Sequence, residues 1–388
     1  MNWRLIAVLL PLHLTAAGCA MFGGDSEDPI EPPAELVDFE PRLDIRRVWS
    51  ARVGSSAEGL RLRLAPATDG TRIYAGSHDG QVAAFEAETG RRVWAMRTRL
   101  PLAAGPGYGG GVLAFGSNDG DLIALEAATG EERWRLQVGG EVLAPPAIGG
   151  GVVVLRTVDG RLRGYSALDG RLLWTVEHPV PSLTLRGTTA PVISGTTVIA
   201  GFDNGRLGAY ELTTGEVRWE APLTTPTGRS ELERLVDLSA DIVVVGRDVY
   251  AAGYNGRAVA IALETGLVLW QQELSSYAGV GADWNSIYVT TDVSEIVALD
   301  QAGGTQRWRQ PALRLREATA ATAYRNTVVV GDLEGYLHWL DPADGSFLAR
   351  ERVGSRRIDA PPLVVGNHVY AQTEDGTVAA YTIRDETT

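Results

Sequence analysis

The sequence contains no lysine and only one cysteine, Cys19, among 388 residues. A single cysteine can form neither an intramolecular disulfide nor a cysteine-based zinc site. Past the N-terminal twenty residues there are four histidines, dispersed without metal-ligand spacing: His78, His178, His338 and His368. These absences leave no candidate metal centre and no Cys–His or Ser–His–Asp nucleophile, so we predict no catalytic residues, no metal and no cofactor.

Positive charge is also scarce. The formal net charge is −13, and a phosphate backbone needs a basic face, so a nucleic-acid partner is not expected. Hydrophobic residues make up 45% of the chain and charged residues 21%, which is enough apolar material for a buried core. The longest apolar run near the start, Leu5–Leu14, is too short to span a bilayer.

The N-terminus has the layout of a secretory signal peptide. Arg4 precedes the apolar run, and small residues follow it up to Cys19. Residues 16–19, Ala-Ala-Gly-Cys, resemble a bacterial lipobox, in which the cysteine is acylated after residues 1–18 are removed. Ala20 at the next position implies sorting to the outer membrane. The alternative is an ordinary signal peptide with an incidental cysteine.

Residues 19–41 are expected to form an acidic tether behind the acylated cysteine. Pro29, Pro32 and Pro33 lie within this stretch. It also carries seven acids, Asp25, Glu27, Asp28, Glu31, Glu35, Asp38 and Glu40. Such a segment buries little and repels itself, so we expect it to stay extended and to precede a folded domain at residues 42–384.

Three landmarks recur in fixed order through that domain. The first is a hairpin pair, mostly Asp-Gly or Asn-Gly, with its glycine at 80, 120, 160, 205, 256, 335 and 376; Ser294 replaces the glycine of one further hairpin. The second is a Thr-Gly or Asp-Gly pair about ten residues later, where such a pair is present. The third is a tryptophan four residues after that, at 94, 134, 174, 219, 270 and 308. We expect type I′ turns at the hairpin pairs, and short β-rich runs lie between the landmarks.

The eight hairpins are spaced by 40, 40, 45, 51, 38, 41 and 41 residues. A period near 40 with four short strands per repeat predicts an all-β, eight-bladed β-propeller of four-stranded blades. In the third repeat the strands are expected at 144–148, 152–155, 161–165 and 172–176. The last repeat lacks its fourth strand, and a spare strand around Trp49 has nothing before it. The N-terminal strand should therefore close the ring and protect the sheet edges.

Single residues of the repeat have structural roles in this interpretation. The tryptophans should pack between neighbouring sheets, with Ala349 as a smaller filler at the eighth position. The hairpin aspartates should be turn residues. Ala-Pro pairs such as 144–145 should mark the start of each innermost strand, where an edge tolerates proline.

Departures from the period locate three insertions, of five, five and eleven residues, after Trp49, Trp174 and Trp219. Each falls between the fourth strand of one blade and the second strand of the next, so all should emerge on one face. The second insertion contains Leu183, Leu185 and Arg186; the third contains Asp237 and Asp241. Either these loops bind a partner, or the leucines fold back and Arg186 merely pairs with Asp237; the residues alone leave both open.

Taken together, these motifs resemble the BamB family, the propeller lipoproteins of the outer-membrane β-barrel assembly (BAM) machinery. The resemblance rests on the lipobox, the acidic tether, the PQQ-like repeat, and residues 182–187 followed by 234–237. It implies a non-enzymatic scaffold that binds the periplasmic POTRA domains of BamA alongside other BAM components and assists insertion of barrel proteins. The partner-binding residues it implies are Leu183, Leu185, Arg186, Asp237, Ser239 and Asp241. Ser239 stands where the family often has an acid.

Two other functions share the repeat. Quinone (PQQ)-dependent dehydrogenases are propellers of this kind, but they need a metal site and a cofactor cage, which the dispersed histidines do not suggest. A cell-wall or polysaccharide-binding propeller would expose aromatics on the hairpin face, and only Tyr254 and Tyr336 lie near turns there. The favoured localisation is the outer membrane, lipid-anchored and facing the periplasm.

Overall fold

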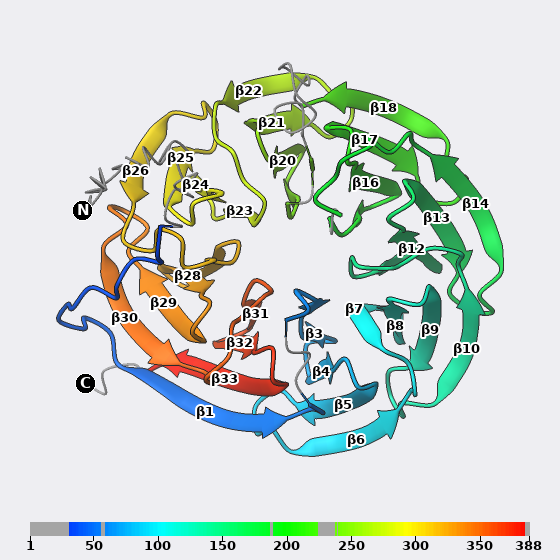
Figure 1. Cartoon of the computed structure of the whole chain (residues 1–388), viewed down its shortest axis with the longest axis horizontal. Coiled ribbons are helices and arrows are strands. Elements are labelled where there is room, and N and C mark those ends of the chain that lie inside the picture. The colour runs from blue at the N-terminus through cyan, green and yellow to red at the C-terminus, as the bar shows by residue number, and fades with distance from the viewer. Residues whose placement is uncertain (1–30, 56–58, 187–188, 224–236, 239, 385–388) are drawn as a thin grey trace, which may run out of the picture. The chain divides into compact units, whose positions relative to one another are not determined.

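The structure, a computed structural model, describes residues 31–55, 59–186, 189–223, 237–238 and 240–384. The described residues form β-strands and no helix, and the strands are arranged in eight sheets around a ring (Figure 1). Within these ranges, no helix has the length and apolar character that a membrane span requires. The eight-bladed propeller expected from the repeat is confirmed.

We number the blades in chain order and letter their strands A to D from the inside outwards. Blade 1 comprises β3 (Ala67–Thr68), β4 (Arg72–Gly76), β5 (Gln81–Glu86) and β6 (Arg92–Arg97). Blade 2 comprises β7 (Leu102–Gly109), β8 (Val112–Ser117), β9 (Asp121–Glu126) and β10 (Glu132–Gln137). Blade 3 comprises β11 (Ala147–Gly149), β12 (Val152–Arg156), β13 (Arg161–Ser166) and β14 (Leu172–Glu177). Blade 4 comprises β15 (Val192–Ser194), β16 (Thr197–Gly201), β17 (Arg206–Glu211) and β18 (Val217–Pro222).

The second half of the ring follows the same order. Blade 5 comprises β19 (Val243–Val245), β20 (Asp248–Ala252), β21 (Ala258–Ala262) and β22 (Val268–Gln272). Blade 6 comprises β23 (Gly279–Ala282), β24 (Ser286–Thr290), β25 (Ile296–Asp300) and β26 (Gln306–Gln310). Blade 7 comprises β27 (Thr322–Tyr324), β28 (Thr327–Gly331), β29 (Tyr336–Leu340) and β30 (Phe347–Arg352). Blade 8 comprises β31 (Leu363–Val365), β32 (His368–Gln372), β33 (Thr377–Ile383) and β1 (Ile45–Arg52).

The N-terminal strand closes the ring, as expected. β1 pairs antiparallel with β33, from Ile45 opposite Ile383 to Arg52 opposite Thr377. Beyond the pairing, the backbone amide of Arg384 donates to the carbonyl of Asp44 at 2.8 Å, and the two side chains form an ion pair at 2.9 Å. One blade departs from four strands: β2 (Arg63–Leu64) adds a fifth, parallel strand along β7 in blade 2. In blade 3 the A strand begins at Ala147, after the Ala-Pro pair rather than within it.

The repeated tryptophans pack between blades. Each of the seven lies on the Thr-Gly-type turn glycine of the following blade, so that an added Cβ at that glycine would come within 3.0 Å of the indole. Each indole N–H also donates to a backbone carbonyl of that next blade, at 2.7–3.1 Å. The glycine and the tryptophan are therefore two halves of one inter-blade contact.

The missing eighth tryptophan has a structural reason. Ala349 faces blade 8, where strands C and D come from opposite ends of the chain and no C–D turn exists for an indole to cover. The space is filled instead by Trp339 of β29, whose ring packs edge-on against Tyr381 at 6.1 Å between centroids, and by Leu43.

The hairpin pairs differ from the expected two-residue type I′ turns. In blade 1 the amide of Gly80 donates to the carbonyl of Ser77 at 3.0 Å, and only the glycine of the Asp-Gly pair has positive φ. This is a three-residue loop, a type I turn followed by a left-handed residue. Ser294, which replaces the glycine in blade 6, adopts the same left-handed conformation with φ 65°.

The segment expected as a free tether differs too. Residues from Pro33 onward belong to the propeller unit rather than joining it at 42. Phe39 stacks on Phe347 of β30 at 5.3 Å between ring centroids, and Arg350 lies over the Phe39 ring. Thus one aromatic side chain within an acidic, proline-rich stretch fixes that stretch to blade 7.

Candidate docking site

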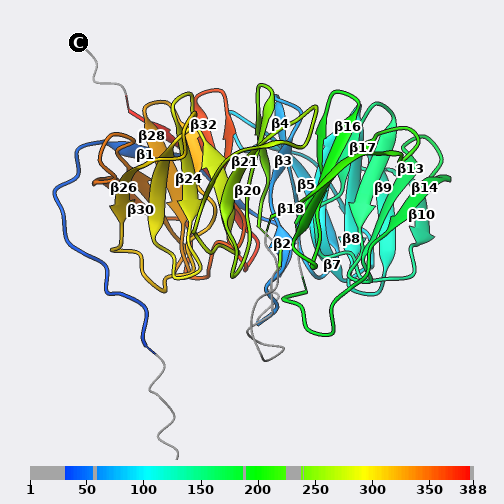
Figure 2. The ribbon, with the colours of Figure 1, turned by 90° about the horizontal axis from the view of Figure 1, so that it is seen from above.

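The long connections all emerge on one face of the ring. The three insertions are the D-to-A loops 53–66, 178–191 and 223–242, as the repeat arithmetic predicts. On this loop face the D-to-A loops begin beside the B–C turns: the amides of His178 and Leu223 donate to the turn glycine carbonyls of Gly160 and Gly205, at 3.0 and 2.9 Å. Loop 178–191 precedes blade 4 and loop 223–242 follows it, and their described residues meet where the Thr189 hydroxyl donates to the carbonyl of Leu238. Figure 2 shows the sheets of the ring edge-on, between the two faces.

Loop 178–191 is held by buried contacts at its two ends and in its middle. His178 stacks on Phe202 with ring centroids 3.7 Å apart, and its Nε2 lies 2.8 Å from the Tyr210 hydroxyl. In the middle, the backbone amide of Leu185 donates to Oδ2 of Asp237 at 2.9 Å. Near the end, the hydroxyl of Thr189 donates to a backbone carbonyl of loop 223–242, that of Leu238. Three contacts therefore fix the described part of the loop, at His178, Leu185 and Thr189.

What this loop presents to solvent is apolar and cationic. Leu183 and Leu185 are 42% and 41% exposed although both are large hydrophobic residues. Arg186 adopts a left-handed backbone, and its guanidinium forms an ion pair with Glu141 of the preceding D-to-A loop. Two exposed leucines beside an arginine are a surface suited to an apolar partner groove with an acidic rim.

Asp237 lies inside the protein. It is completely buried, and its backbone pairs with Tyr254 as an isolated bridge. Burial, reinforced by the nearby carboxylate of Asp203, raises the pKa of Asp237 to about 7. The alternative in which Arg186 pairs with Asp237 is not what the structure shows, because the ion-pair partner of Arg186 is Glu141. Asp237 orients the loop through the Leu185 amide instead.

Asp241 has a different partner. Its carboxylate accepts two hydrogen bonds from the guanidinium of Arg63, at 2.6 and 2.9 Å, and so joins loop 223–242 to loop 53–66. Asp241 also forms a parallel bridge with Gly279. Ser239 and Cys19 lie outside the described residues. Neither Glu141 nor Arg63 was singled out from the sequence, because each pairs with a residue of another blade's loop and nothing local marks the pairing.

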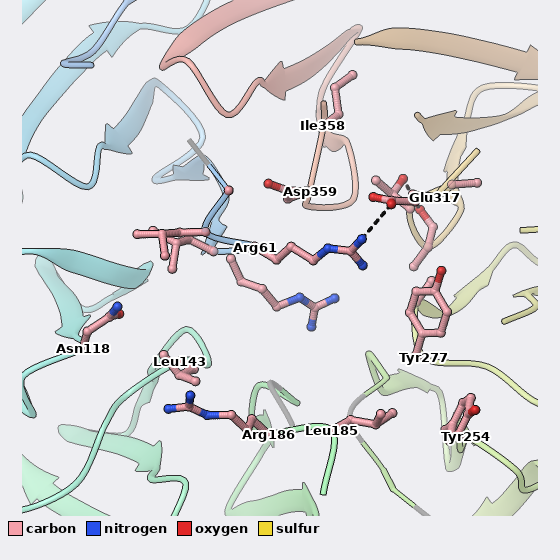
Figure 3. A pocket seen from close by; sticks show the side chains of 18 of the residues that line it. Arg61, Asn118, Leu143, Leu185, Arg186, Tyr254, Tyr277, Glu317, Ile358 and Asp359 are labelled. Atoms are coloured by element: carbon pink, nitrogen blue, oxygen red, sulfur yellow. Dashed lines mark hydrogen bonds and ion pairs between the residues drawn. The ribbon is translucent and has the colours of Figure 1, made fainter. Parts of the chain in front are cut away.

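A cavity of about 750 Å³ opens on the loop face, inside the ring of D-to-A loops. Leu185 and Arg186 lie on one side of it, and Arg61 pairs with Glu317 on the other (Figure 3). Asp359 also lines it, and burial raises the pKa of that carboxyl to about 7. Leu185 and Arg186 thus bring loop 178–191 to the rim of a cavity that has both apolar and charged lining residues. Among the described residues, no group of three or more His, Cys, Asp or Glu side chains is placed to hold a metal ion.

Comparison with known proteins gives a family for this arrangement. The sequence profile described as "Outer membrane protein assembly factor BamB" matches residues 37–97, 78–310 and 292–388. The outer membrane protein assembly factor BamB of Pseudomonas aeruginosa is 46% identical over 378 residues, covering 97% of this chain and 98% of that protein. The chain belongs to the BamB family. The BamB of Escherichia coli is 33% identical over 392 residues, covering 98% of this chain and the whole of that protein.

Solved structures agree. The crystal structure of BamB from Moraxella catarrhalis superposes with a TM-score of 0.79 at 27% identity, covering 87% of this chain and all of that one. A quinohemoprotein alcohol dehydrogenase from Comamonas testosteroni reaches 0.68 at 14% identity, covering 92% of this chain and 79% of that one, which shows the shared propeller fold alone. The resemblance inferred from the motifs is therefore confirmed, and the protein is an assembly factor associated with the outer membrane.

Proposed function

We propose that this BamB-family protein is a non-enzymatic scaffold of the BAM complex, and that loop 178–191 docks onto the POTRA domains of BamA. Leu183 and Leu185 would enter an apolar groove of the partner, and Arg186 would bind a carboxylate at its rim. Other BAM components would assemble around this contact, which assists the folding and insertion of outer-membrane β-barrel proteins. Acylated Cys19 would anchor the chain to the outer membrane on its periplasmic side.

The observation that carries the docking proposal is the combination of exposure and fixation in one loop. Exposed leucines on a mobile loop would lose conformational entropy on binding, whereas the contacts of His178, Leu185 and Thr189 hold this loop in advance. Asp237 contributes from beneath, as a positioning residue. Asp241 contributes by fixing loop 223–242 to Arg63. Ser239 is included because it occupies the position at which the family often has a partner-binding acid.

No specific observation favours the alternative functions. The likeness to quinohemoprotein dehydrogenases is a likeness of fold. A polysaccharide site would need exposed aromatic rings that lie together. Tyr254 lines the cavity, as Leu185 does, whereas the Tyr336 ring is covered by Arg352, whose Cζ lies 5.2 Å from the ring centroid. The two rings therefore do not form one stacking platform.

The docking proposal is tested by Leu183→Glu, which puts a charge where an apolar contact is expected. The matched control is Leu168→Glu, an exposed leucine of blade 3 in the C–D turn, on the opposite face. We expect Leu183→Glu to abolish co-purification of BamA from detergent-solubilised envelopes while Leu168→Glu leaves it intact, with both variants melting as the wild type does. Equal recovery of BamA by the two variants would contradict the proposal.

The anchor is tested by Cys19→Ala. Each buried CH₂ of an acyl chain contributes roughly 0.8 kcal/mol, so several chains make membrane attachment effectively stable. We expect the variant to appear in the soluble periplasmic fraction or to stall in processing when BamA is depleted. Recovery of the processed variant with the outer membrane under that condition would contradict lipid anchoring.

A further inference from the structure

A buried ionic cluster lies beneath loop 178–191, and three successive blades contribute one side chain each. Arg156 ends β12 of blade 3, Asp203 lies in the B–C turn of blade 4, and Asp237 precedes β19 of blade 5. Arg156 and Asp203 form an ion pair, and the side chain of each is 2% exposed. Asp237 has no exposed surface. None of the three can touch a docked partner directly.

The cluster is poorly satisfied for a group so deeply buried. The guanidinium of Arg156 pairs with Asp203, and both charges act on the pKa of the nearby Asp237. Among the described residues, Nε and Nη1 of Arg156 and Oδ1 of Asp237 have no protein hydrogen-bond partner. Buried polar atoms without partners destabilise a fold, and most native proteins avoid them. A purely structural role would be served better by an apolar cluster of similar volume. A buried ion pair is therefore weak evidence for a contribution to stability, and the position of this one beneath the loop is the feature to explain.

The sequence repeat marks Arg156 as an exception. It occupies the last position of strand B, four residues before the turn glycine. The equivalent residues of the other blades are Gly76, Gly116, Gly201, Ala252, Thr290, Gly331 and Gln372. At Gly116 and Gly331 an added Cβ would meet a side chain of the next D-to-A loop at 2.3 and 2.7 Å. In blade 3 the Arg156 side chain occupies the space that a side chain of the following D-to-A loop fills at Gly116 and Gly331.

We propose that Arg156 and Asp203 are positioning residues of the docking site, acting on loop 178–191 through Asp237. The ion pair fixes the Asp203 carboxylate, which interacts electrostatically with Asp237. Oδ2 of Asp237 in turn accepts from the Leu185 amide. Arg156 also lies over the Phe202 ring, 5.7 Å from its centroid. His178, at the start of the loop, packs against the same ring with the two ring centroids 3.7 Å apart. One buried cation thus links the first and the middle anchor of the loop. This inference rests on the proposed docking function.

The test compares two buried arginines in the full-length protein. Arg156→Met and Asp203→Asn perturb the cluster, and Arg316→Met is the matched control, because Arg316 forms the corresponding buried pair with Asp332 in the opposite part of the ring. Binding is measured against the soluble POTRA region of BamA, and backbone amide exchange is followed at Leu185. A second pair, Asp237→Asn and Asp237→Ala, separates loss of the oxygen acceptor from loss of the charge.

We expect Arg156→Met and Asp203→Asn to weaken POTRA binding at least tenfold and to speed exchange of the Leu185 amide. Arg316→Met should leave binding within twofold and exchange unchanged, even though it lowers the melting temperature. Asp237→Asn should retain binding and Asp237→Ala should lose it. If Arg156→Met fails to fold, the proposal is judged on Asp203→Asn, which is nearly isosteric, and on the comparison of Asp237→Asn with Asp237→Ala.

Two results would overturn one claim without the other. In the first, Asp203→Asn binds as the wild type does and keeps its Leu185 amide protected, while Leu183→Glu fails to bind. This result would refute the positioning role and leave the docking surface supported. Wild-type binding by Leu183→Glu would refute the docking surface, while faster Leu185 exchange in Asp203→Asn would still support the positioning role.

Discussion

Two buried arginine–aspartate pairs lie in opposite parts of the ring, and their surroundings differ. Arg316 donates to Asp332 from Nε and Nη2 at 3.0 and 2.8 Å, and to the carbonyl of Ala34 at 2.9 Å. His338 completes this closure-side network: its Nδ1 accepts from Arg350, so its Nε2 donates to Asp332 at 3.0 Å. On the docking side, the pair of Arg156 and Asp203 is left with unpartnered atoms and an extra carboxylate.

We interpret the closure-side network as structural and the docking-side cluster as the positioning device proposed above. The closure-side network meets its hydrogen-bonding needs and fastens the N-terminal segment, since Arg316 and Arg350 both donate to carbonyls of residues 34–37. In the docking-side cluster some buried polar atoms have no protein hydrogen-bond partner, and Asp237 of this cluster holds an exposed loop. The two regions should therefore respond differently to mutation and to pH.

The largest effect is expected from breaking the closure side altogether, by deleting residues 45–53. The deletion removes β1, leaves β33 with a free edge and takes away the Trp49 contact with blade 1. We expect loss of cooperative thermal unfolding, or aggregation, measured by circular dichroism and light scattering. A deletion variant that melts at the wild-type temperature as a monomer would show that closure through β1 is dispensable.

Arg316→Met is expected to have the next largest effect. Removing one partner of a buried ion pair leaves an uncompensated charge and typically costs about 3–5 kcal/mol of unfolding free energy. Here the orphan would be Asp332, whose side chain is fully buried. Denaturant unfolding measures the loss, and Arg42→Met, whose arginine is half exposed at its ion pair with Asp341, serves as the surface control. Equal stability of the two variants would contradict the distinction.

The pH response should differ in sign between His338 on the closure side and Asp237 on the docking side, whereas His178, whose pKa burial also lowers, should respond as His338 does. Burial lowers the pKa of His338, so the folded state binds fewer protons there and the closure side loses stability as pH falls through about 6.5. Burial raises the pKa of Asp237 to about 7, next to Asp203 and Arg156, so the folded state binds more protons and the docking side loses stability as pH rises from about 4 to 7.

Asp237→Asn isolates the second of these effects. The variant keeps an oxygen for the Leu185 amide but cannot ionise, so its stability relative to the wild type should rise between pH 4 and pH 7, by about 2–4 kcal/mol in total. Denaturant unfolding at several pH values gives the difference. A stability difference that stays constant across this range would mean that Asp237 titrates near its ordinary value.

The comparison also shows what the sequence could and could not predict. Hairpin spacing and tryptophan phase predict the blades, the closure and the face of the long loops, because each depends on a local repeat. Departures from the repeat carried further information: Ala349 marks the blade without a C–D turn, and Arg156 at a position that is usually glycine marks the buried cluster. The pairings of Arg186 with Glu141 and of Arg63 with Asp241 join different loops and have no local signal.

The smallest effect on stability is expected at the exposed end of the docking side. Arg186 is 63% exposed at its side chain, and exposed ion pairs contribute about 0–1 kcal/mol, so Arg186→Ala and Glu141→Ala should each leave the melting temperature almost unchanged. Docking should respond differently, because Arg186 would be desolvated against a partner carboxylate, and losing one member of such a pair costs about 2–5 kcal/mol of binding. We therefore expect Arg186→Ala to lose the POTRA region in a binding assay, while Glu141→Ala, which removes only the resting partner of the arginine, retains it. If Arg186→Ala instead lowers the melting temperature sharply, the arginine belongs to the structure of the loop and not to its binding surface.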